Sequence, residues 1–238
     1  MRYALYFTPD RDHLLTVAAA AWLGRDAFSN TAVPIVDNHG LDPAELLRWT
    51  AEPRRYGFHA TLVAPFQLRP DNNERDIICA AEIFAARSRP VLQQHLKLAL
   101  LDRFLALVPS TTCGELAGLA AAAVDHLHHL RAPLTVQEIA RRNPERLTER
   151  QRAYLDRYGY PYVKDEFRFH MTLTGPVTTA EAARIEPVLH CLLAPMLVTP
   201  IEVDSVALFV EPEPGAPFTV HSTYRLRAGE TGKTACHA

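Results

Sequence analysis

Residues 58–65 read Phe-His-Ala-Thr-Leu-Val-Ala-Pro, and residues 169–176 read Phe-His-Met-Thr-Leu-Thr-Gly-Pro. Both stretches match the pattern F-H-x-T-L-x-x-P, and their histidines, His59 and His170, are 111 positions apart (170 − 59). One H-x-T sequence arises easily by chance, whereas two copies with matching flanks do not. The repeat therefore predicts two similar half-sites that face one cleft.

The spacing within each copy places the polar side chains together. Alternate residues of a strand share a face, so His59 and Thr61 point to one side while their apolar neighbours point to the other. The second copy repeats this arrangement with Arg168, His170 and Thr172 on its polar face. If both polar faces line one groove, two imidazoles, two hydroxyls and a guanidinium meet there.

These side chains suit acid–base chemistry on a phosphodiester, without metal or other cofactor. Imidazole titrates near neutral pH, so one histidine can be a neutral base while its partner is a protonated acid. A threonine hydroxyl can donate to a phosphate oxygen, and a guanidinium can stabilise developing negative charge. We expect His59, Thr61, His170 and Thr172 to be catalytic. The sequence leaves open which histidine is the base, and either histidine considered alone would more readily be a structural strand residue.

Three further residues are predicted to bind substrate. Arg168 shares a face with His170, although a surface salt bridge explains it equally well. Arg55 has the same parity as His59, and the phenol ring of Tyr56 could stack on a base or a sugar at the cleft edge, with a purely structural role as the alternative. The arginine-rich stretch 141–157 is interpreted as a solvated helix face, and a mobile lid over an anionic substrate is the less favoured interpretation.

The hydrophobic pattern around the motifs predicts an α+β fold, because antiparallel strands and helices alternate in two similar runs. We expect two pseudo-symmetric lobes of antiparallel sheet with helices on the outer face and a central cleft. The predicted strands cover 2–7, 56–66, 91–100, 103–108, 167–174, 201–210 and 219–227. The predicted helices cover 10–23, 43–50, 73–87, 111–130 and 179–193, with a charged helix ending at Gly159.

The whole chain is expected to form a single bilobal domain over residues 1–228. The motif repeats occupy 56–66 and 167–176, a charged insertion occupies about 131–165, and residues 229–238 form a flexible tail. At 238 residues the chain is long enough to bury a substantial core.

Composition and missing motifs narrow the functional classes. The net charge of −2 argues against a surface dominated by nucleic-acid binding. No apolar run approaches the length of about 18 residues that a membrane span needs. The four cysteines form no C-x-x-C, which predicts free thiols and a cytoplasmic location. Neither G-x-x-x-x-G-K-[ST] nor G-x-G-x-x-G occurs, so nucleotide-triphosphate and dinucleotide folds are unsupported.

The residues around the two motifs resemble those of the 2H phosphoesterase superfamily. This superfamily is named for two H-x-[ST] motifs and includes 2′,3′-cyclic phosphodiesterases and 2′-5′ RNA ligase-like proteins. Within it the chain is most similar to the DUF1045 branch, which gene neighbourhood links to phosphonate metabolism. The stretches that carry this resemblance are 55–62, 158–162 and 167–175. It extends from Tyr3 to about Arg227.

The resemblance implies a two-lobed α+β fold, a central cleft and metal-independent catalysis, with His59, Thr61, His170 and Thr172 at the catalytic positions. The branch often has a lysine directly after its first H-A-T-L. Here that position is Val63, which strand parity puts on the polar side. If that lysine contacts substrate, the specificity of this chain is expected to differ.

The leading hypothesis is a metal-independent hydrolase for a cyclic or linear phosphodiester of a small ribose-containing metabolite, acting in phosphonate metabolism. An RNA-end 2′,3′-cyclic phosphodiesterase or ligase is one alternative. A non-catalytic module that binds a phosphorylated metabolite or RNA is another, and a metal-dependent hydrolase would be sensitive to chelator. The expected partner is a small phosphorylated metabolite or nucleotide, with an RNA end as the alternative and no membrane; the oligomeric state stays open.

Overall fold

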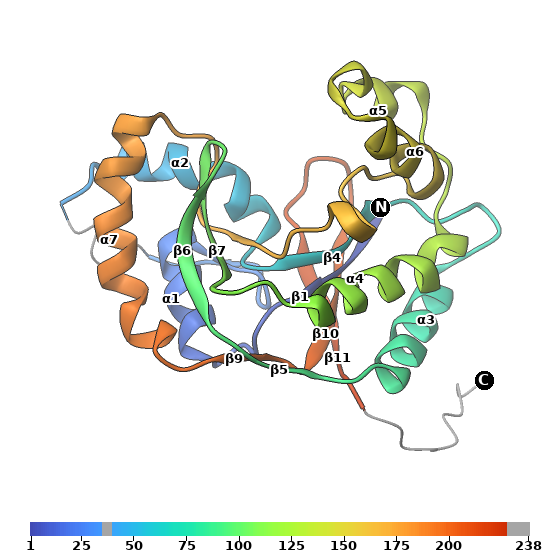
Figure 1. Ribbon diagram of the computed structural model, residues 1–238, viewed down its shortest axis with the longest axis horizontal. Coiled ribbons are helices and arrows are strands. Elements are labelled where there is room, and N and C mark those ends of the chain that lie inside the picture. Colours follow the sequence, from blue (N-terminus) through green and yellow to red (C-terminus); the bar gives the residue numbers. More distant parts are fainter. Residues whose placement is uncertain (35–39, 228–238) are drawn as a thin grey trace.

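The computed structural model describes residues 1–34 and 40–227 (Figure 1), so the predicted tail at 229–238 lies outside the described residues. The strands are β1 (Arg2–Phe7), β2 (Arg25–Asp26), β3 (Thr31–Ala32), β4 (Ala60–Phe66), β5 (Val91–Gln94), β6 (Leu96–Leu101), β7 (Phe104–Pro109), β8 (Met171–Thr172), β9 (Ile201–Val203), β10 (Ser205–Glu211) and β11 (Thr219–Arg225).

Seven helices and three short 3₁₀ turns accompany these strands in the described part of the chain. The helices are α1 (Leu14–Leu23), α2 (Pro43–Tyr56), α3 (Glu74–Arg87), α4 (Gly114–Leu127), α5 (Val136–Ala140), α6 (Glu149–Tyr158) and α7 (Thr179–Leu197). The 3₁₀ turns are η1 (His128–Leu130), η2 (Pro144–Arg146) and η3 (Lys164–Glu166).

One seven-stranded sheet organises the molecule, in the order β11-β10-β1-β4-β8-β7-β6. Every neighbouring pair in it is antiparallel. Against it pack α3 and α4, over β4, β10 and β11, and α7, over β6 and β7. The predicted α+β class with antiparallel strands is confirmed, and the two halves meet in a single continuous sheet.

The two motifs lie on the central strands of this sheet. β4 pairs with β8 through Ala60 and Met171, which are the middle residues of the two H-x-T copies. Their separation (171 − 60 = 111) equals that of the histidines, so a local two-fold axis passes between this pair. In an antiparallel ladder the axis places His59 across from Thr172 and His170 across from Thr61.

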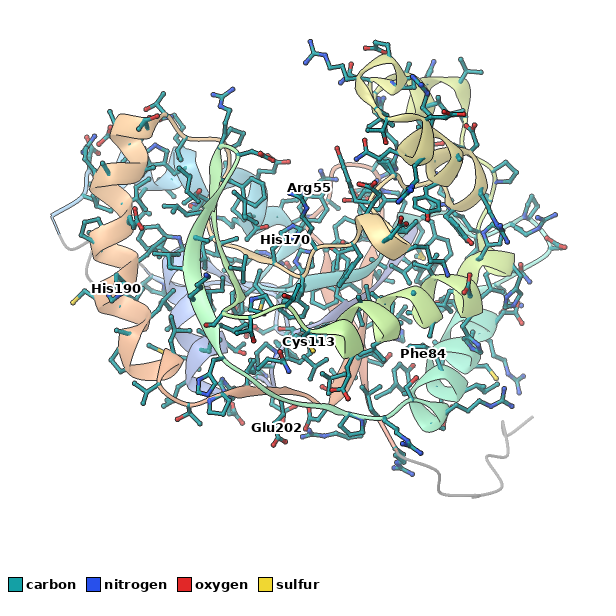
Figure 2. All side chains as sticks on the ribbon, viewed as in Figure 1. Arg55, Phe84, Cys113, His170, His190 and Glu202 are labelled. Atoms are coloured by element: carbon teal, nitrogen blue, oxygen red, sulfur yellow. The ribbon has the colours of Figure 1, made fainter. Side chains whose placement is uncertain are left out.

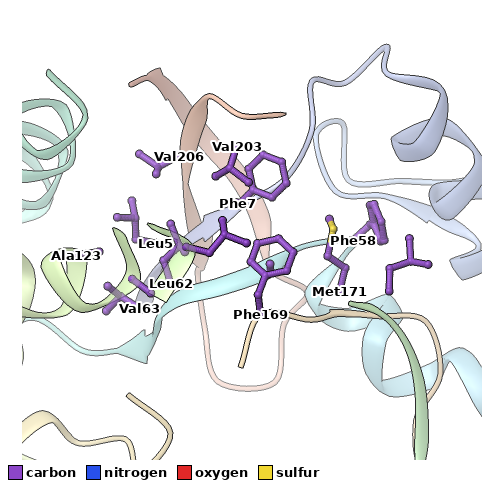
Figure 3. Packing of buried hydrophobic residues seen from close by; sticks show 14 of the residues in the cluster. Leu5, Phe7, Phe58, Leu62, Val63, Ala123, Phe169, Met171, Val203 and Val206 are labelled. Carbon is purple, nitrogen blue, oxygen red and sulfur yellow. The ribbon is translucent and has the colours of Figure 1, made fainter. Parts of the chain in front are cut away.

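The apolar residues of both motifs form the centre of the core. Phe58, Leu62, Phe169 and Met171 are all buried, and Figure 3 shows them packed with Phe7 between the sheet and its helices. Burial of one strand face against helices leaves the opposite face of the same strands for the polar residues. The sheet therefore presents both H-x-T pairs on its other side.

Helix α2 is longer than the sequence pattern predicts, and it replaces the expected strand at Tyr56. Pro53 lies inside this helix and has no N–H to donate to the carbonyl of Trp49. That carbonyl instead accepts a 2.6 Å hydrogen bond from the N–H of Gly175. The second motif thus satisfies the group that the proline leaves free, and α2 continues to Tyr56.

A β-bulge corrects the expected position of Val63. The register passes from Tyr6–Thr61 to Leu5–Val63, so β4 contains one extra residue there and its alternation shifts. Val63 is 7% exposed and packs in the core with Leu5. The prediction that it shares the polar face with His59 is wrong.

The insertion forms a small helical unit of α5, η2 and α6, with α5 and α6 at the upper right of Figure 1, and η3 follows it against α4. Its charged helix ends at Gly159, as predicted, with φ +68°. The buried side chain of Arg131 donates a 3.0 Å hydrogen bond to the carbonyl of Gly159, and Arg131 also forms a β-bridge with Leu68. This contact between Arg131 and Gly159, the clasp, ties together the beginning of the insertion and the end of α6.

The cysteines differ in part from expectation. Cys113 and Cys191 are free thiols, whereas Cys79 is disulfide-bonded, so the prediction of free thiols is wrong at Cys79. Cys236 lies outside the described residues. None of the helices within 1–34 and 40–227 has the length and apolar character needed to cross a membrane.

Candidate active site

The two histidines are held in the same orientation by matching hydrogen bonds. Nδ1 of His59 lies 2.9 Å from the carbonyl oxygen of Gly57, and Nδ1 of His170 lies 2.7 Å from that of Arg168. Each acceptor is two residues before its histidine. A carbonyl can only accept, so Nδ1 carries the proton and Nε2 is left with a lone pair in both neutral rings.

The chain reaches this geometry at His59 because α2 ends at a glycine. Gly57 has φ +78°, and a Cβ atom there would lie only 2.5 Å from the Cβ of Ala27. A residue with a side chain would be strained and would clash. Gly57 therefore allows the turn that aims its own carbonyl at the imidazole.

Aromatic rings from the flanking strands support both imidazoles. The Tyr6 ring on β1 stacks on His59 with centroids 3.8 Å apart and planes 20° apart. The Phe104 ring on β7 lies 5.7 Å from that of His170. His170, labelled in Figure 2, lies near the middle of the molecule in this view. Packing on one side of each ring leaves its edge directed at the polar face of the sheet.

A cavity of about 350 Å³ lies over these strands, and all four predicted catalytic side chains line it. The hydroxyl of Thr61 is 3.2 Å from Nε2 of His59 and is the donor, because that nitrogen carries no proton. Thr172 and His170 belong to the other half of the two-fold arrangement. The structure thus brings His59, Thr61, His170 and Thr172 together, while their catalytic role stays a prediction.

Burial keeps both imidazoles neutral near pH 7. Desolvation lowers the pKa of His59 to about 4, against the hydrogen bond from its Nδ1 to Gly57, and the charge of His170 lowers it further. Desolvation also lowers the pKa of His170, opposed by its bond to the Arg168 carbonyl. His59 is consequently the ring that is neutral down to the lower pH, and the neutral form is the one that a general base requires.

One end of the cavity is lined by phenols and guanidiniums: Arg2, Tyr6, Tyr56, Arg142 and Tyr160. The guanidinium of Arg142 lies 5.5 Å from the centre of the Tyr160 ring. Burial raises the pKa of Tyr160 to about 12 and places that of Tyr6 well above its usual value, so these hydroxyls remain hydrogen-bond donors.

A second cavity of about 450 Å³ adjoins the first. Thr61, Phe104, Tyr160 and His170 line both, so the motif residues stand between the two spaces. Asp102, Glu166 and Arg168 give the second cavity a mixed charge. The site is therefore open on two sides of His170.

A protein-family model matches residues 61–219, which is more than half of the chain, and its description reads "Protein of unknown function (DUF1045)". The chain belongs to the DUF1045 family. This membership agrees with the resemblance found in the sequence. The matched residues include Thr61, His170 and Thr172, whereas β1, α2 and His59 precede them.

Two curated relatives of this DUF1045 chain carry the name ribose 1,5-bisphosphate phosphokinase PhnN. The one from Janthinobacterium sp. (strain Marseille) is 39% identical over 221 residues, covering 91% of this chain and 49% of the relative. The one from Laribacter hongkongensis (strain HLHK9) is 33% identical over 232 residues, covering 97% of this chain and 53% of the relative. The chain spans about half the length of these relatives.

Two solved structures align with nearly the whole chain at low sequence identity. TT0787 of Thermus thermophilus has a TM-score of 0.45 at 17% identity, covering 96% of this chain and 99% of that one. LigT of E. coli complexed with NADP+ has a TM-score of 0.42 at 12% identity, covering 95% and 97%.

The three predicted substrate-binding residues lie in different places. Tyr56 lines the first cavity, and the exposed Arg168 lines the second beside His170. Arg55 is not among the residues lining either cavity. Its guanidinium pairs with the carboxylate of Glu211 and lies 3.3 Å from the carbonyl of Ala216.

Sequence reasoning missed Arg2, Tyr6, Arg142 and Tyr160. Arg2 and Tyr6 belong to the first predicted strand. The two-residue period of a strand puts both, with Ala4, on one face, so this pattern could have indicated that they lie together. Of the arginine-rich stretch, Arg142 lines the cavity, whereas Arg150 pairs with Asp165 on the surface. The sequence pattern does not distinguish Arg142 from its neighbours, because its direction is set by the turn that follows α5.

No group of three or more His, Cys, Asp or Glu side chains in the described part of the chain is arranged to hold a metal ion. The charged side chains that line the first cavity are Arg2, Arg142 and Glu52. Its carboxylate, Glu52, lies on α2 one turn before Tyr56, with Oε2 4.0 Å from where a Cβ on Gly175 would be.

Proposed function

We propose that this protein is a metal-independent phosphodiesterase that hydrolyses a cyclic or linear phosphodiester of a small ribose-containing metabolite by two-histidine acid–base catalysis. The observation that carries the proposal is the matched pair of imidazoles. Both have Nδ1 fixed by a carbonyl two residues earlier, and both rings line one cavity. Two such nitrogens on either side of a phosphate supply a base and an acid.

In the proposed reaction His59 is the base. A water molecule attacks phosphorus while Nε2 of His59 accepts its proton, which requires the Thr61 hydroxyl to turn from Nε2 to a phosphate oxygen. The bond between phosphorus and the leaving oxygen breaks, and that oxygen takes a proton from Nε2 of protonated His170. A bound anionic phosphate favours this protonated form of His170. The product of a cyclic diester is a monoester with one free hydroxyl.

The threonines and the cavity walls complete the proposed site. The hydroxyls of Thr61 and Thr172 can each donate to a non-bridging oxygen, where negative charge develops. The volume of about 350 Å³ is suited to a small metabolite. The names of the two curated relatives concern ribose 1,5-bisphosphate, which supports a ribose phosphate framework. Their phosphokinase activity is not proposed here, since the chain contains no G-x-x-x-x-G-K-[ST] motif.

The deciding experiment compares His59→Ala and His170→Ala with wild type on a panel of cyclic phosphodiesters, in the presence of chelator. Loss of either general acid or base is expected to reduce turnover by about 10²–10⁴-fold. His190→Ala is the matched control, since this histidine lies on the exposed side of α7 and away from His170 in Figure 2. Wild-type rates in both single variants would refute the proposal, and loss of activity in chelator would favour a metal-dependent hydrolase.

A leaving-group test separates the two histidine roles. With a p-nitrophenyl phosphodiester, the departing phenolate needs no proton. We therefore expect His170→Ala to recover most of its activity on this substrate, whereas His59→Ala stays inactive. The opposite pattern would exchange the roles, and binding without turnover of any diester by wild type would favour a non-catalytic binding module.

A further inference from the structure

The phenol and guanidinium end of the first cavity offers more positive charge and more donors than one phosphodiester needs. Here the donor cluster means Arg2, Tyr6, Tyr56, Arg142 and Tyr160, all of which line the cavity. We propose that the donor cluster binds a second, terminal phosphate of the substrate, so that the substrate is a sugar phosphodiester that also carries a phosphomonoester. This inference rests on the proposed function for the chemistry at the histidines.

The charge of Arg142 is not neutralised by the protein. No carboxylate among the described residues pairs with its guanidinium. The acid with most influence on it, Glu138, already accepts hydrogen bonds from the N–H and hydroxyl of Thr135 at the start of α5. Arg142 is half-buried over Tyr160, where desolvation lowers its pKa from the usual value. A half-buried cation without a counter-ion is the feature that an anionic ligand would complete.

Arg2 adds to this charge, although it has a partner. The carboxylate of Glu211 is fully buried and binds Arg2, Arg55 and the N–H of Gly215. One carboxylate therefore serves two guanidiniums. Arg2, Arg55 and Glu211 together keep one positive charge in excess (2 − 1), and Arg142 is a further cation with no paired carboxylate. Excess positive charge of this kind suits the dianion of a phosphomonoester.

The three phenols of the donor cluster have free hydroxyls. Across residues 1–34 and 40–227, no hydrogen bond joins the hydroxyl of Tyr6, Tyr56 or Tyr160 to another protein group. Each phenol lines the cavity, and those of Tyr6 and Tyr160 hold their protons to high pH. Phosphate oxygens accept several hydrogen bonds, whereas a sugar or base edge would also present donors of its own.

The donor cluster begins directly beside His59 and extends outward from it along the same cavity. Tyr6 stacks directly on His59, and the next ring outward, Tyr56, is 6.2 Å from His59 between centroids. Glu52, the carboxylate of this cavity, lies one turn of α2 before Tyr56 and faces Gly175. Its charge therefore disfavours a dianion on the Gly175 side of the cavity.

The kinetic test compares a nucleoside 2′,3′-cyclic phosphate with the same compound carrying a 5′-phosphate. Wild type is expected to prefer the 5′-phosphorylated substrate by about tenfold or more in kcat/KM, the size of one charge-assisted hydrogen bond. Arg142→Gln is expected to remove most of this preference. Arg141→Gln is the control, because it deletes the same charge from the neighbouring exposed residue. Tyr160→Phe removes one hydroxyl while keeping the ring and is expected to weaken the preference.

A binding measurement tests the donor cluster independently of turnover. Titration calorimetry is expected to show that ribose 5-phosphate binds and ribose does not, with Arg142→Gln weakening binding by about tenfold and Arg141→Gln leaving it unchanged. If the two cyclic substrates react equally and ribose 5-phosphate does not bind, the donor cluster proposal is overturned while the proposed function stands. If ribose 5-phosphate binds through Arg142 but no diester is hydrolysed, the donor cluster stands and the proposed function fails.

Discussion

The clasp between Arg131 and Gly159 predicts that Gly159→Ala destabilises the protein far more than an ordinary glycine substitution. A Cβ at Gly159 would overlap the guanidinium of Arg131, lying only 2.5 Å from its Cζ. The guanidinium is held by its 3.0 Å bond to the Gly159 carbonyl and lies 5.6 Å from the Phe66 ring centre. The adjoining cavity is only about 10 Å³, so the side chain has no space to withdraw into.

The expected loss follows from two contributions. Alanine at a left-handed φ of +68° costs about 1 kcal/mol. Displacing the guanidinium breaks a charge-assisted hydrogen bond and leaves a buried cation unsatisfied, which costs about 2–3 kcal/mol. Together the free energy of unfolding is expected to fall by about 3–4 kcal/mol, which lowers Tm by on the order of 10 °C for a chain of this size.

The assay is thermal unfolding followed by circular dichroism, with Gly215→Ala as the matched control. Gly215 also has a positive φ, +94°, but no described atom lies within 4 Å of the position that an added methyl group would occupy. It therefore carries the backbone strain of about 1 kcal/mol without the clash. Equal losses of Tm in the two variants would refute the contribution of the clasp.

Four other outcomes are expected. The kcat/KM profile should rise through pH 4 as His59 loses its proton and fall through the pKa of His170, which lies below its ordinary value of about 6.5; a plateau extending to pH 8 would contradict these roles. The unfolded chain binds a proton at His59 below about pH 6.5, whereas the folded protein binds it only below about pH 4. As the pH is lowered from 6.5 to 4, the free energy of unfolding measured by urea titration should therefore fall by at most about 3 kcal/mol. His59→Ala should flatten this dependence. Glu211→Gln should cost about 2–3 kcal/mol in urea unfolding, because it leaves two guanidiniums without their carboxylate, and an unchanged midpoint would refute its structural role. Val63→Lys should lower Tm strongly by placing an ammonium in the core; an unchanged Tm would mean that the side chain reaches solvent.

Strand alternation was sufficient to predict the central arrangement of this fold. The residues Phe58, Ala60 and Leu62 are buried where the two-residue period puts them, and His59 and Thr61 face the cavity. The repeat also predicted that two distant segments would converge, since equal motifs need equal environments. These features depend on local pattern, which a sequence displays directly.

Tertiary contacts explain what local pattern could not predict. Pro53 normally indicates the end of a helix, but the N–H of Gly175 takes over the carbonyl that the proline leaves unpaired. The bulge that turns Val63 inward depends on the register with β1. Arg142 enters the cavity from the turn after α5, and nothing in its neighbours distinguishes it from the exposed Arg141.

The two-fold axis between Ala60 and Met171 has a stereochemical consequence. A phosphorus atom held near this axis has one imidazole on each side, so the entering and departing oxygens occupy opposite apices of a trigonal bipyramid. Such a single displacement inverts the configuration at phosphorus. A phosphorothioate analogue of known configuration, opened in isotopically labelled water, should therefore give the product with inverted configuration at phosphorus. Retention, or a mixture of both epimers at phosphorus, would contradict a single in-line attack.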